Sequence, residues 1–307
     1  MQCVAFIQTA FAGIQGFLSD IRSACPQTAV RKSMNSFLSK VVVITGAGSG
    51  IGRALAMAFA GQGAQLALND FNERTLQETV AALPAETEVF VSAFDVSKKE
   101  LMFQFADDVL RKFGKVDVVV NNAGVAIAGF RTDEVSIEDY EWIMGINLWG
   151  MIYGSLAFLP HLRKQKESSL VNVSSIFGLH GIPAQAPYVT TKFAIRGFTE
   201  SLALEEQVIG SGVTVSSVHP GGIKTNIAKA SKGAEVDPQA IAEFEKQFKT
   251  TPERAAEIIL KGIRRKKSRI LVGTDAHVFH FAAHRMRFLL SFFLKRGFKR
   301  TVGKQSS

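Results

Sequence analysis

Short apolar segments alternate with longer segments of helical periodicity along most of this chain, and this alternation restricts the fold more than any other feature. Residues 41–45 form a continuous run of valine, isoleucine and threonine, and a glycine-rich segment and a helical pattern follow at once. A short strand that is apolar on both faces is typical of a parallel sheet covered by helices on both sides. The repeated order of strand and helix therefore predicts a doubly wound α/β fold.

Seven segments fit the strand pattern and six fit the helix pattern. The expected strands cover residues 41–45, 65–70, 89–96, 116–121, 170–174, 213–219 and 269–272. The expected helices cover residues 51–61, 73–83, 98–113, 137–163, 188–208 and 251–261. Since no linker rich in Pro, Gly or Ser interrupts the series, it predicts a single domain over residues 40–273. Its fold is a Rossmann-type doubly wound sheet of seven parallel strands.

Residues 1–39 precede the first expected strand, and three interpretations of them stay open. They carry apolar residues at near-helical spacing but lack the positively charged start of a secretory signal. They form an export or transit segment, an amphipathic arm, or a stretch that is not native or is disordered because Met34 is the natural start. N-terminal peptide sequencing of the native protein tests the third interpretation.

Composition and charge favour an ordered body with a basic C-terminal segment. Hydrophobic residues make up 47% of the chain and charged residues 21%, which argues against intrinsic disorder of the whole chain. The formal net charge is +9, but residues 258–307 hold thirteen Lys or Arg and one acid, Asp275. That segment carries +12 and the residues before it −3. Because the expected catalytic body is not basic, nucleic-acid binding by the whole fold has no compositional support.

The cysteine count limits disulfides and metal sites. Cys3 and Cys25 are the only cysteines, so residues 34–307 can contain neither a disulfide nor a thiolate metal site. A reducing interior suits this usage, and we expect a cytoplasmic protein. No His, Cys, Asp or Glu cluster has the spacing of metal ligands, so a catalytic metal is not expected. No apolar run reaches the roughly 18 to 20 residues that span a bilayer, so a transmembrane helix is not predicted.

The glycine-rich segment after the first strand predicts a dinucleotide site. Gly46, Gly50 and Gly52 have the spacing G-x-x-x-G-x-G, directly between a strand and an apolar helix. Residues without side chains let the backbone approach a pyrophosphate, which then lies at the positive end of the helix. The expected cofactor contacts in this segment are Thr45, Gly46, Gly48, Ser49, Gly50, Ile51 and Gly52.

Asp70 ends the second expected strand and indicates which cofactor binds. A carboxylate there can accept hydrogen bonds from an adenosine ribose and repels a 2′-phosphate. No Lys or Arg lies in the glycine loop or directly after Asp70, so we expect NAD in preference to NADP. Arg53 and Arg74 are near enough in sequence to keep NADP as the alternative. Asp70 could instead serve as a helix N-cap or a turn acid.

Two further strand ends carry candidate cofactor residues. Asp95 and Val96 end the third expected strand, where the carboxylate could meet the adenine amino group, although an N-cap for the next helix is the competing interpretation. The fourth strand is followed by small and amide residues that can line the cofactor site. These are Asn122, Ala123 and Gly124.

Tyr188 and Lys192 are four residues apart within an expected helix, so they share one face of it. The Lys192 ammonium can therefore lie beside the phenol and favour its ionised form. Lowering the phenol pKa from about 10 by about 3 units needs roughly 4 kcal/mol of preferential stabilisation. A close ammonium in a partly desolvated site can supply that amount. The competing interpretation is an ordinary contact on a helix surface.

In this order the motifs resemble those of the short-chain dehydrogenase/reductase family, over roughly residues 40–273. The markers are residues 45–52, Asp95, residues 121–124, Asn147, Ser175, Tyr188 with Lys192, and Pro220 and Gly221 followed by Thr225. The resemblance implies that Tyr188 is the general acid/base and that Ser175 binds the substrate oxygen. It also implies that Lys192 holds the nicotinamide ribose and lowers the Tyr188 pKa, and that Asn147 keeps a water in the proton relay.

Several choices between neighbouring residues follow from the match. Ser174 and Ser175 both end a strand, and the interval of thirteen residues to Tyr188 selects Ser175. Thr225, in the loop after Pro220, could bind the nicotinamide carboxamide. His219 precedes that turn, a place that is more often structural than catalytic. The resemblance further suggests a homodimer or homotetramer packed through the helices that contain Asn147 and Tyr188.

The loop after Pro220 and the tail over residues 274–307 bear on substrate and location. Apolar residues in the loop (Ile227, Ile241, Phe244 and Phe248) suggest a hydrophobic alcohol or carbonyl substrate. The tail combines aromatic residues with cations, which is typical of a helix lying peripherally on an anionic membrane. Packing of the tail on the body or on a partner subunit is the alternative.

The sequence as a whole predicts an oxidoreductase that transfers a hydride between a nicotinamide cofactor and a hydrophobic alcohol or carbonyl compound. Tyr188 is its expected acid/base. The alternative is a membrane-associated binding or scaffold protein that keeps the dehydrogenase fold without turnover. The complete set of Asn147, Ser175, Tyr188 and Lys192 argues for the enzyme.

Overall fold

The structure is a computed structural model that describes residues 36–128, 131–225, 232–233, 248 and 250–305. The chain divides into two compact units, Met1–Ser33 and Met34–Ser307, and all described residues belong to the second. Most of the N-terminal extension therefore lies outside the described residues. The same is true of Ile227, Ile241 and Phe244 in the loop after Pro220.

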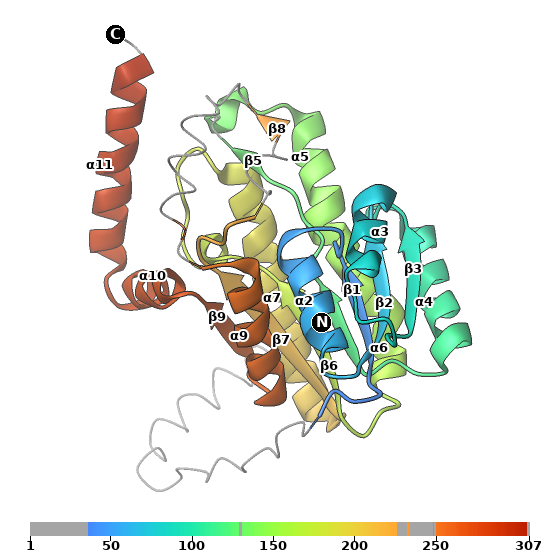
Figure 1. The fold of residues 1–307 in the computed structure, drawn as a ribbon. Coiled ribbons are helices and arrows are strands. Elements are labelled where there is room, and N and C mark those ends of the chain that lie inside the picture. Colours follow the sequence, from blue (N-terminus) through green and yellow to red (C-terminus); the bar gives the residue numbers. More distant parts are fainter. Residues whose placement is uncertain (1–35, 129–130, 226–231, 234–247, 249, 306–307) are drawn as a thin grey trace, which may run out of the picture. The chain divides into compact units, whose positions relative to one another are not determined.

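One seven-stranded sheet, with every neighbouring pair parallel, forms the centre of the second unit (Figure 1). Its strands are β1 (Val41–Thr45), β2 (Gln65–Asp70), β3 (Val89–Ala93), β4 (Val118–Asn121), β6 (Ser168–Val173), β7 (Val213–Pro220) and β9 (Arg269–Val272). The strand order is β3-β2-β1-β4-β6-β7-β9, so the direction of winding reverses between β1 and β4. That reversal places a ligand-binding point outside the carboxyl ends of β1 and β4. The predicted doubly wound fold is confirmed.

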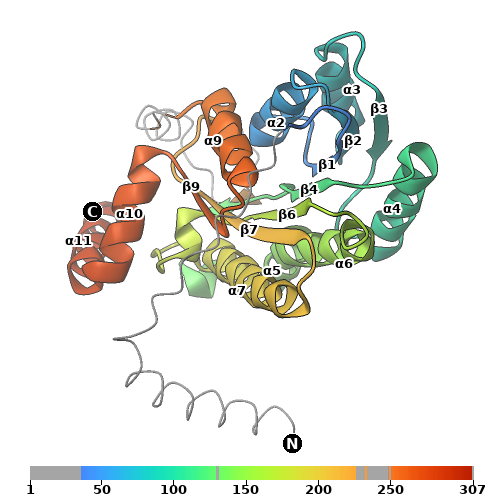
Figure 2. The same cartoon turned by 90° about the horizontal axis from the view of Figure 1, so that it is seen from below.

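Helices cover both faces of the sheet, as Figure 2 shows from below. On one face lie α2 (Gly50–Ala60), α3 (Glu73–Ala81) and α9 (Pro252–Arg264). On the other lie α4 (Lys99–Phe113), α5 (Ile137–Met144), α6 (Gly150–Leu162) and α7 (Ala186–Ile209). Successive side chains of β1 enter different cores: Val42 and Ile44 pack in one, Val41 and Val43 in the other. This two-sided burial explains why β1 is apolar throughout.

The segment predicted as one helix over residues 137–163 contains a wider turn. After α5, residues Gly145–Trp149 form a π-helical turn, and α6 continues from Gly150. A π turn inserts one residue into the helix and is frequent at functional sites. It carries Asn147 here, and that buried side chain belongs to the candidate site.

By length and composition alone, Ile137–Leu162 could also cross a membrane, and it is the one such helix among the described residues. Half of its most apolar window is buried inside the fold. Met151, Ala157 and Phe158 are among the buried side chains. The core helix of an α/β sheet passes the same test of length and apolarity.

Besides two short 3-10 helices, η1 (Thr132–Glu134) and η3 (Ile176–Gly178), four described elements lie outside the predicted series of strands and helices. Two short strands, β5 (Ile127–Ala128) and β8 (Lys232–Gly233), pair with each other in parallel. Two residues are too few to show strand periodicity, so the sequence could not predict them. After β9, the tail forms two helices, α10 (Thr274–Arg285) and α11 (Arg287–Gln305).

Candidate active site

The glycine loop between β1 and α2 is shaped by close backbone contacts. Gly46 has a φ of 67°, which L side chains rarely adopt, and a Cβ there would lie 2.8 Å from the Ala123 Cα. A Cβ on Gly52 would overlap the Gly46 carbonyl oxygen. Both glycines are therefore required by the loop itself. The loop leads into the N-terminus of α2, whose N-cap is Ser49, with Gly50 and Ile51 in its first turn.

Hydrogen bonds join the carboxyl ends of β1 and β4. The Thr45 hydroxyl accepts bonds from the backbone N–H groups of Asn122 and Ala123, each at 3.1 Å. The Asn122 side-chain amide donates to the carbonyls of Thr45, at 2.9 Å, and Gly46, at 3.1 Å. The residues predicted to line the cofactor site thus also hold the two strand ends together.

The Asp70 carboxylate fixes the turn that faces the glycine loop. It accepts a bond from the Gly48 N–H at 2.8 Å and one from the Asn72 N–H at 2.9 Å. The two nearby cations are engaged elsewhere. Arg53 donates to the Gly48 carbonyl at 2.6 Å and to α3, while Arg74 pairs with Glu78.

Asp95 and Val96 follow β3. The Asp95 carboxylate accepts a bond from the Ser97 N–H at 2.9 Å, and its carbonyl accepts one from Lys98, so Asp95 closes the turn before α4. The N-cap position of α4 is Lys98, which makes no side-chain cap bond. Val96 is buried against Gly150.

The structure brings Ser175, Tyr188 and Lys192 together. Ser175 follows β6, and its hydroxyl accepts a bond from the Phe177 N–H at 3.1 Å and lies near enough to the Tyr188 phenol to influence its pKa. The Lys192 Nζ lies 5.3 Å from the centre of the Tyr188 ring and donates to the Val173 carbonyl at 3.1 Å. Ser174 is turned elsewhere, because its hydroxyl donates to the Lys192 carbonyl at 2.7 Å. Of the two neighbouring serines, Ser175 is the one placed for chemistry with Tyr188.

Burial has the largest effect on the pKa values of Tyr188 and Lys192. Although part of the Tyr188 residue reaches solvent, desolvation raises the pKa of its phenol to about 12, and the nearby Ser175 hydroxyl opposes this only in part. Lys192 is 3% exposed, and burial lowers the pKa of its ammonium to about 8. The sequence argument expected Lys192 to lower the Tyr188 pKa. That expectation is wrong for this structure, because the cost of burying a phenolate exceeds the stabilisation that it receives.

Asn147 is held between two elements of the site. Its Oδ1 accepts a bond from the Val125 N–H at 2.7 Å. Its Nδ2 donates to the Val125 carbonyl at 2.9 Å and to the Thr191 hydroxyl at 3.2 Å. Gly124 lies beside both Asn147 and Lys192, since a Cβ there would be 3.2 Å from Asn147 Oδ1 and 3.5 Å from Lys192 Nζ. Residues 121–124 therefore connect the glycine loop to the Tyr188 site.

The loop after β7 also reaches the glycine loop. Thr225 contacts Gly50, because a Cβ on this glycine would lie 3.1 Å from the Thr225 methyl carbon. Pro220 ends β7, and the next residue, Gly221, donates its N–H to the Val272 carbonyl. The loop therefore lies beside the glycine loop, and its cofactor role stays a prediction.

Asp275 contacts the loop after β7, and the sequence analysis did not predict this contact. Its carboxylate, in the first turn of α10, accepts a bond from the Gly222 N–H at 2.6 Å, and a Cβ on Gly221 would overlap it. The signal was present in the sequence: Asp275 is the only acid in residues 258–307.

His219 makes structural contacts with Ser175 and Ser217. One ring nitrogen, Nδ1, lies 2.8 Å from the Ser175 carbonyl and Nε2 lies 3.1 Å from the Ser217 hydroxyl. Burial lowers the His219 pKa to about 4, so the ring is neutral at physiological pH. A neutral ring that donates from Nδ1 and accepts at Nε2 satisfies both contacts. His219 thus holds the backbone of Ser175 in place through the Ser175 carbonyl.

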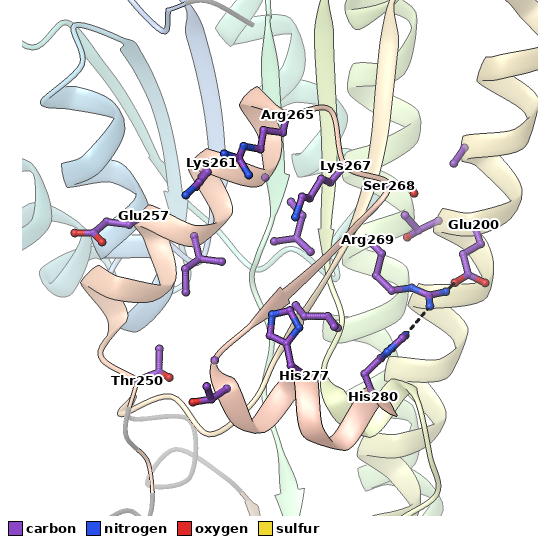
Figure 3. Close-up of a pocket in the computed structure, with 18 of the residues that line it drawn as sticks. Glu200, Thr250, Glu257, Lys261, Arg265, Lys267, Ser268, Arg269, His277 and His280 are labelled. Carbon is purple, nitrogen blue, oxygen red and sulfur yellow. Dashed lines mark hydrogen bonds and ion pairs between the residues drawn. The ribbon is translucent and has the colours of Figure 1, made fainter. Parts of the chain in front are cut away.

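A hollow of about 1180 Å³ lies away from these residues, between α7, α9, β9 and α10 (Figure 3). None of the predicted catalytic or cofactor residues lines it. Its labelled cations include Lys261, Arg265 and Lys267, and α10 contributes His277 and His280. Within the residues that the structure describes, no group of His, Cys, Asp and Glu could hold a metal ion.

Comparison with known proteins shows to which family the chain belongs. Residues 40–235 match the family model described as short chain dehydrogenase. The chain belongs to the short-chain dehydrogenase family. SadH of Mycobacterium tuberculosis is 42% identical over 247 residues, which cover 79% of this chain and 89% of SadH.

Solved structures of this family have the same fold. A short-chain dehydrogenase/reductase from Burkholderia phymatum in complex with NAD is similar with a TM-score of 0.72 and 33% identity, covering 81% of this chain and 92% of that one. An alcohol dehydrogenase from Thermococcus sibiricus complexed with 5-hydroxy-NADP has a TM-score of 0.67 and 30% identity, covering 76% and 96%. Both similar structures contain a nicotinamide cofactor or a derivative of one, and they differ in which of these is bound.

Proposed function

We propose that this short-chain dehydrogenase transfers a hydride between a hydrophobic alcohol or carbonyl compound and a nicotinamide cofactor, with Tyr188 as general acid/base. One observation carries the proposal. The Ser175 hydroxyl lies near enough to the Tyr188 phenol to favour its ionised form, and the Lys192 Nζ lies 5.3 Å from the centre of the Tyr188 ring. Residues 121–124 contact the glycine loop between β1 and α2, and that loop leads into the N-terminus of α2, where a pyrophosphate can bind.

Each residue has a distinct proposed role. The hydroxyls of Ser175 and Tyr188 together bind the substrate oxygen, which orients the substrate and stabilises developing negative charge. Tyr188 gives its proton to that oxygen in reduction and takes it in oxidation. The bound cofactor supplies or accepts the hydride at its nicotinamide ring. Lys192 holds the nicotinamide ribose, and Asn147 is the proposed holder of a water in the proton relay.

The direction of proton transfer depends on the Tyr188 pKa. At pH 7 a phenol with a pKa of about 12 is protonated and ready to act as an acid. Ionising it at that pH costs about 7 kcal/mol, so oxidation requires further stabilisation of the phenolate. The Lys192 ammonium, the positive charge of an oxidised nicotinamide and the N-terminus of α7 all favour that anion. Tyr188 is the third residue of α7, where the helix dipole acts.

The cofactor that we propose is NAD. A 2′-phosphate would need a cation beside Asp70. The two arginines nearest to it in sequence, Arg53 and Arg74, already bind protein groups. The Asp70 carboxylate instead repels a phosphate and can accept ribose hydroxyls. Comparing turnover with NAD and NADP tests this choice, and a tenfold preference for NADP would refute it.

Apolar side chains around the site support a hydrophobic substrate. The Phe177 ring packs edge-to-face on Tyr188, with ring centres 6.2 Å apart. Phe248 packs against Gly222 in the loop after β7. A substrate oxygen bound by Ser175 would thus be attached to a carbon skeleton among aromatic rings.

The proposed assembly is a homodimer or homotetramer packed through α6 and α7. These helices expose large apolar side chains: Leu156, Phe193, Leu204 and Val208, with Trp149 just before α6. Apolar side chains on neighbouring helices are typical of a subunit interface. Light scattering of the purified protein checks the assembly, and a monomer at micromolar concentration would contradict it. The proposed location is the cytoplasm.

Replacing Tyr188 by Phe tests the enzyme proposal directly. The variant removes one hydroxyl and keeps the ring, so we expect loss of nearly all turnover, by about 1,000-fold or more, with cofactor affinity near normal. The measurement is NADH absorbance with a panel of hydrophobic alcohols, together with cofactor titration. Wild-type turnover in the variant would overturn the mechanism. No turnover of the wild type with any member of the panel would favour the scaffold alternative.

A further inference from the structure

We propose that the outward side of α10 and α11 docks onto the surface of an anionic phospholipid bilayer. This docking face consists of large apolar side chains that the fold leaves exposed. They are Val278, Phe281, Met286, Phe288, Leu289, Phe292 and Phe293. The proposal concerns where the protein lies and does not depend on the reaction at Tyr188.

The two helices are attached to the body by their opposite side. Ala276 and Ala283 of α10 are buried. In α11 the less exposed positions include Leu290 and Leu294, four residues apart, and Ser291, whose hydroxyl lies 3.2 Å from the His180 ring nitrogen. A helix held along one side presents the other to its surroundings. The aromatic side chains are therefore exposed by the packing of the helices.

The exposure is large for aromatic residues that lie next to one another. Phe288 is 86% exposed and Phe293 is 61% exposed, and both lie in the first two turns of α11. Phe281, on α10, is 59% exposed. Neighbouring exposed rings of this kind mark an interaction surface.

The positive charge around the docking face favours an anionic lipid surface as its partner. Seven Lys or Arg follow Asp275, and no acid does: Arg285, Arg287, Lys295, Arg296, Lys299, Arg300 and Lys304. On α11 the exposed cations Lys295, Arg296 and Lys299 lie in the turns just after the exposed rings. Aromatic rings beside cations match the boundary between acyl chains and anionic headgroups. A second copy docked on the same face would place seven positive charges against seven, which favours the lipid.

The hollow beside α10 adds to the positive potential. Lys261, Arg265 and Lys267 line it, and within the described part of the chain none of the three makes an ion pair. Since His277 and His280 of α10 line the same hollow, these three cations lie on the body side of α10, in addition to those along α11. Fields of one sign raise the local concentration of the opposite charge and weaken with salt.

Vesicle co-sedimentation with the full chain tests the docking. We expect the protein to sediment with phosphatidylcholine vesicles that contain phosphatidylserine and to stay in solution with phosphatidylcholine alone. The double variant Lys295→Gln/Arg296→Gln should weaken binding roughly thirtyfold, and added salt should weaken wild-type binding. The double variant Phe288→Ser/Phe292→Ser should weaken it by more than about tenfold. All four side chains are exposed, so the fold should be unaffected.

Two control variants lose side chains of the same kinds at positions outside the docking face. Lys98→Gln/Lys99→Gln removes two exposed cations at the start of α4, and Leu101→Ser removes an exposed apolar side chain from the same helix. Both should bind vesicles as the wild type does. All variants should retain NADH-linked turnover without vesicles, so failure of docking is distinct from failure of the proposed reaction.

Three results would overturn the proposal. The first is wild-type protein that fails to bind the anionic vesicles. The second is equal binding to neutral vesicles, which would remove the role of charge. The third is a dimer, detected by light scattering, that disappears in Phe288→Ser/Phe292→Ser while vesicles bind neither protein. That last result would identify a second copy of the chain as the occupant.

Discussion

At the scale of single residues, the sequence predicted which groups meet but not what burial does to them. Helical spacing placed Tyr188 and Lys192 on one face, and the count of thirteen residues chose Ser175 over Ser174. The structure joins these three groups. Their pKa values depend on how much of the fold closes over them, and a local sequence pattern does not carry that quantity. The expected depression of the Tyr188 pKa was therefore wrong.

The buried Lys192 predicts an unusual pH dependence of stability. Its folded-state pKa of about 8 lies below the unfolded value of about 10.5, so between these values the unfolded chain binds more protons. Stability must then rise with pH in that window. From pH 8 to pH 10 we expect Lys192 to add about 2 kcal/mol to the free energy of unfolding. Above pH 10 the raised pKa of Tyr188 acts in the opposite sense.

Chemical denaturation at several pH values measures this effect. The difference in unfolding free energy between wild type and Lys192→Met isolates the lysine, because the methionine does not titrate. A difference that stays constant from pH 8 to pH 10 would show that Lys192 is not desolvated in the folded state.

At the scale of elements, strands and long helices followed the apolar pattern, and the exceptions are the elements that matter for the site. The π turn at Gly145–Trp149 has no distinct periodicity, since it differs from the helix around it by one inserted residue. The Asp275 contact joins α10 to the loop after β7 across 53 residues of sequence. A pattern confined to one element cannot show a contact of that range.

Replacing Asp275 should weaken cofactor binding without slowing the chemical step. Asp275→Ala leaves the Gly222 N–H without its acceptor and frees the loop that contains Gly221. Because this contact is exposed, we expect a modest effect: the cofactor KM rises about tenfold while kcat changes little. Asp275→Asn keeps a carbonyl oxygen at the same place and should restore most of the affinity.

Steady-state kinetics with cofactor varied at saturating substrate gives both parameters. Glu257→Ala, which removes an exposed carboxylate paired with Arg254, is the control for loss of a surface charge. A fall in kcat with unchanged KM would assign Asp275 to the chemical step instead of to positioning the loop.

At the scale of the whole molecule, the order of apolar strands and helices was enough to predict the parallel sheet, because each strand is buried between two helical layers. The sequence also separated a basic tail from a body of opposite net charge. It could not show that α10 and α11 contact the segments after β6 and β7, through the His180–Ser291 and Gly222–Asp275 contacts. Those contacts come from tertiary packing between distant parts of the chain.

Cofactor binding should stabilise the whole fold and reveal the preference between NAD and NADP without any turnover. The glycine loop, residues 121–124 and the loop at Thr225 meet only in the folded chain, so a bound dinucleotide opposes unfolding. At 100 times its Kd a ligand adds about 2.7 kcal/mol, which for a domain of this size corresponds to about 5 to 10 °C in Tm. We expect that shift with NAD and a clearly smaller one with NADP at the same concentration.

The variant Asp70→Ser should narrow the difference between the two Tm shifts, because it removes the charge that repels the 2′-phosphate. Gly52→Val should abolish both shifts, since its side chain would overlap the Gly46 carbonyl. Thermal denaturation of the three proteins provides the measurement, and a larger shift with NADP than with NAD in the wild type would reverse the cofactor assignment.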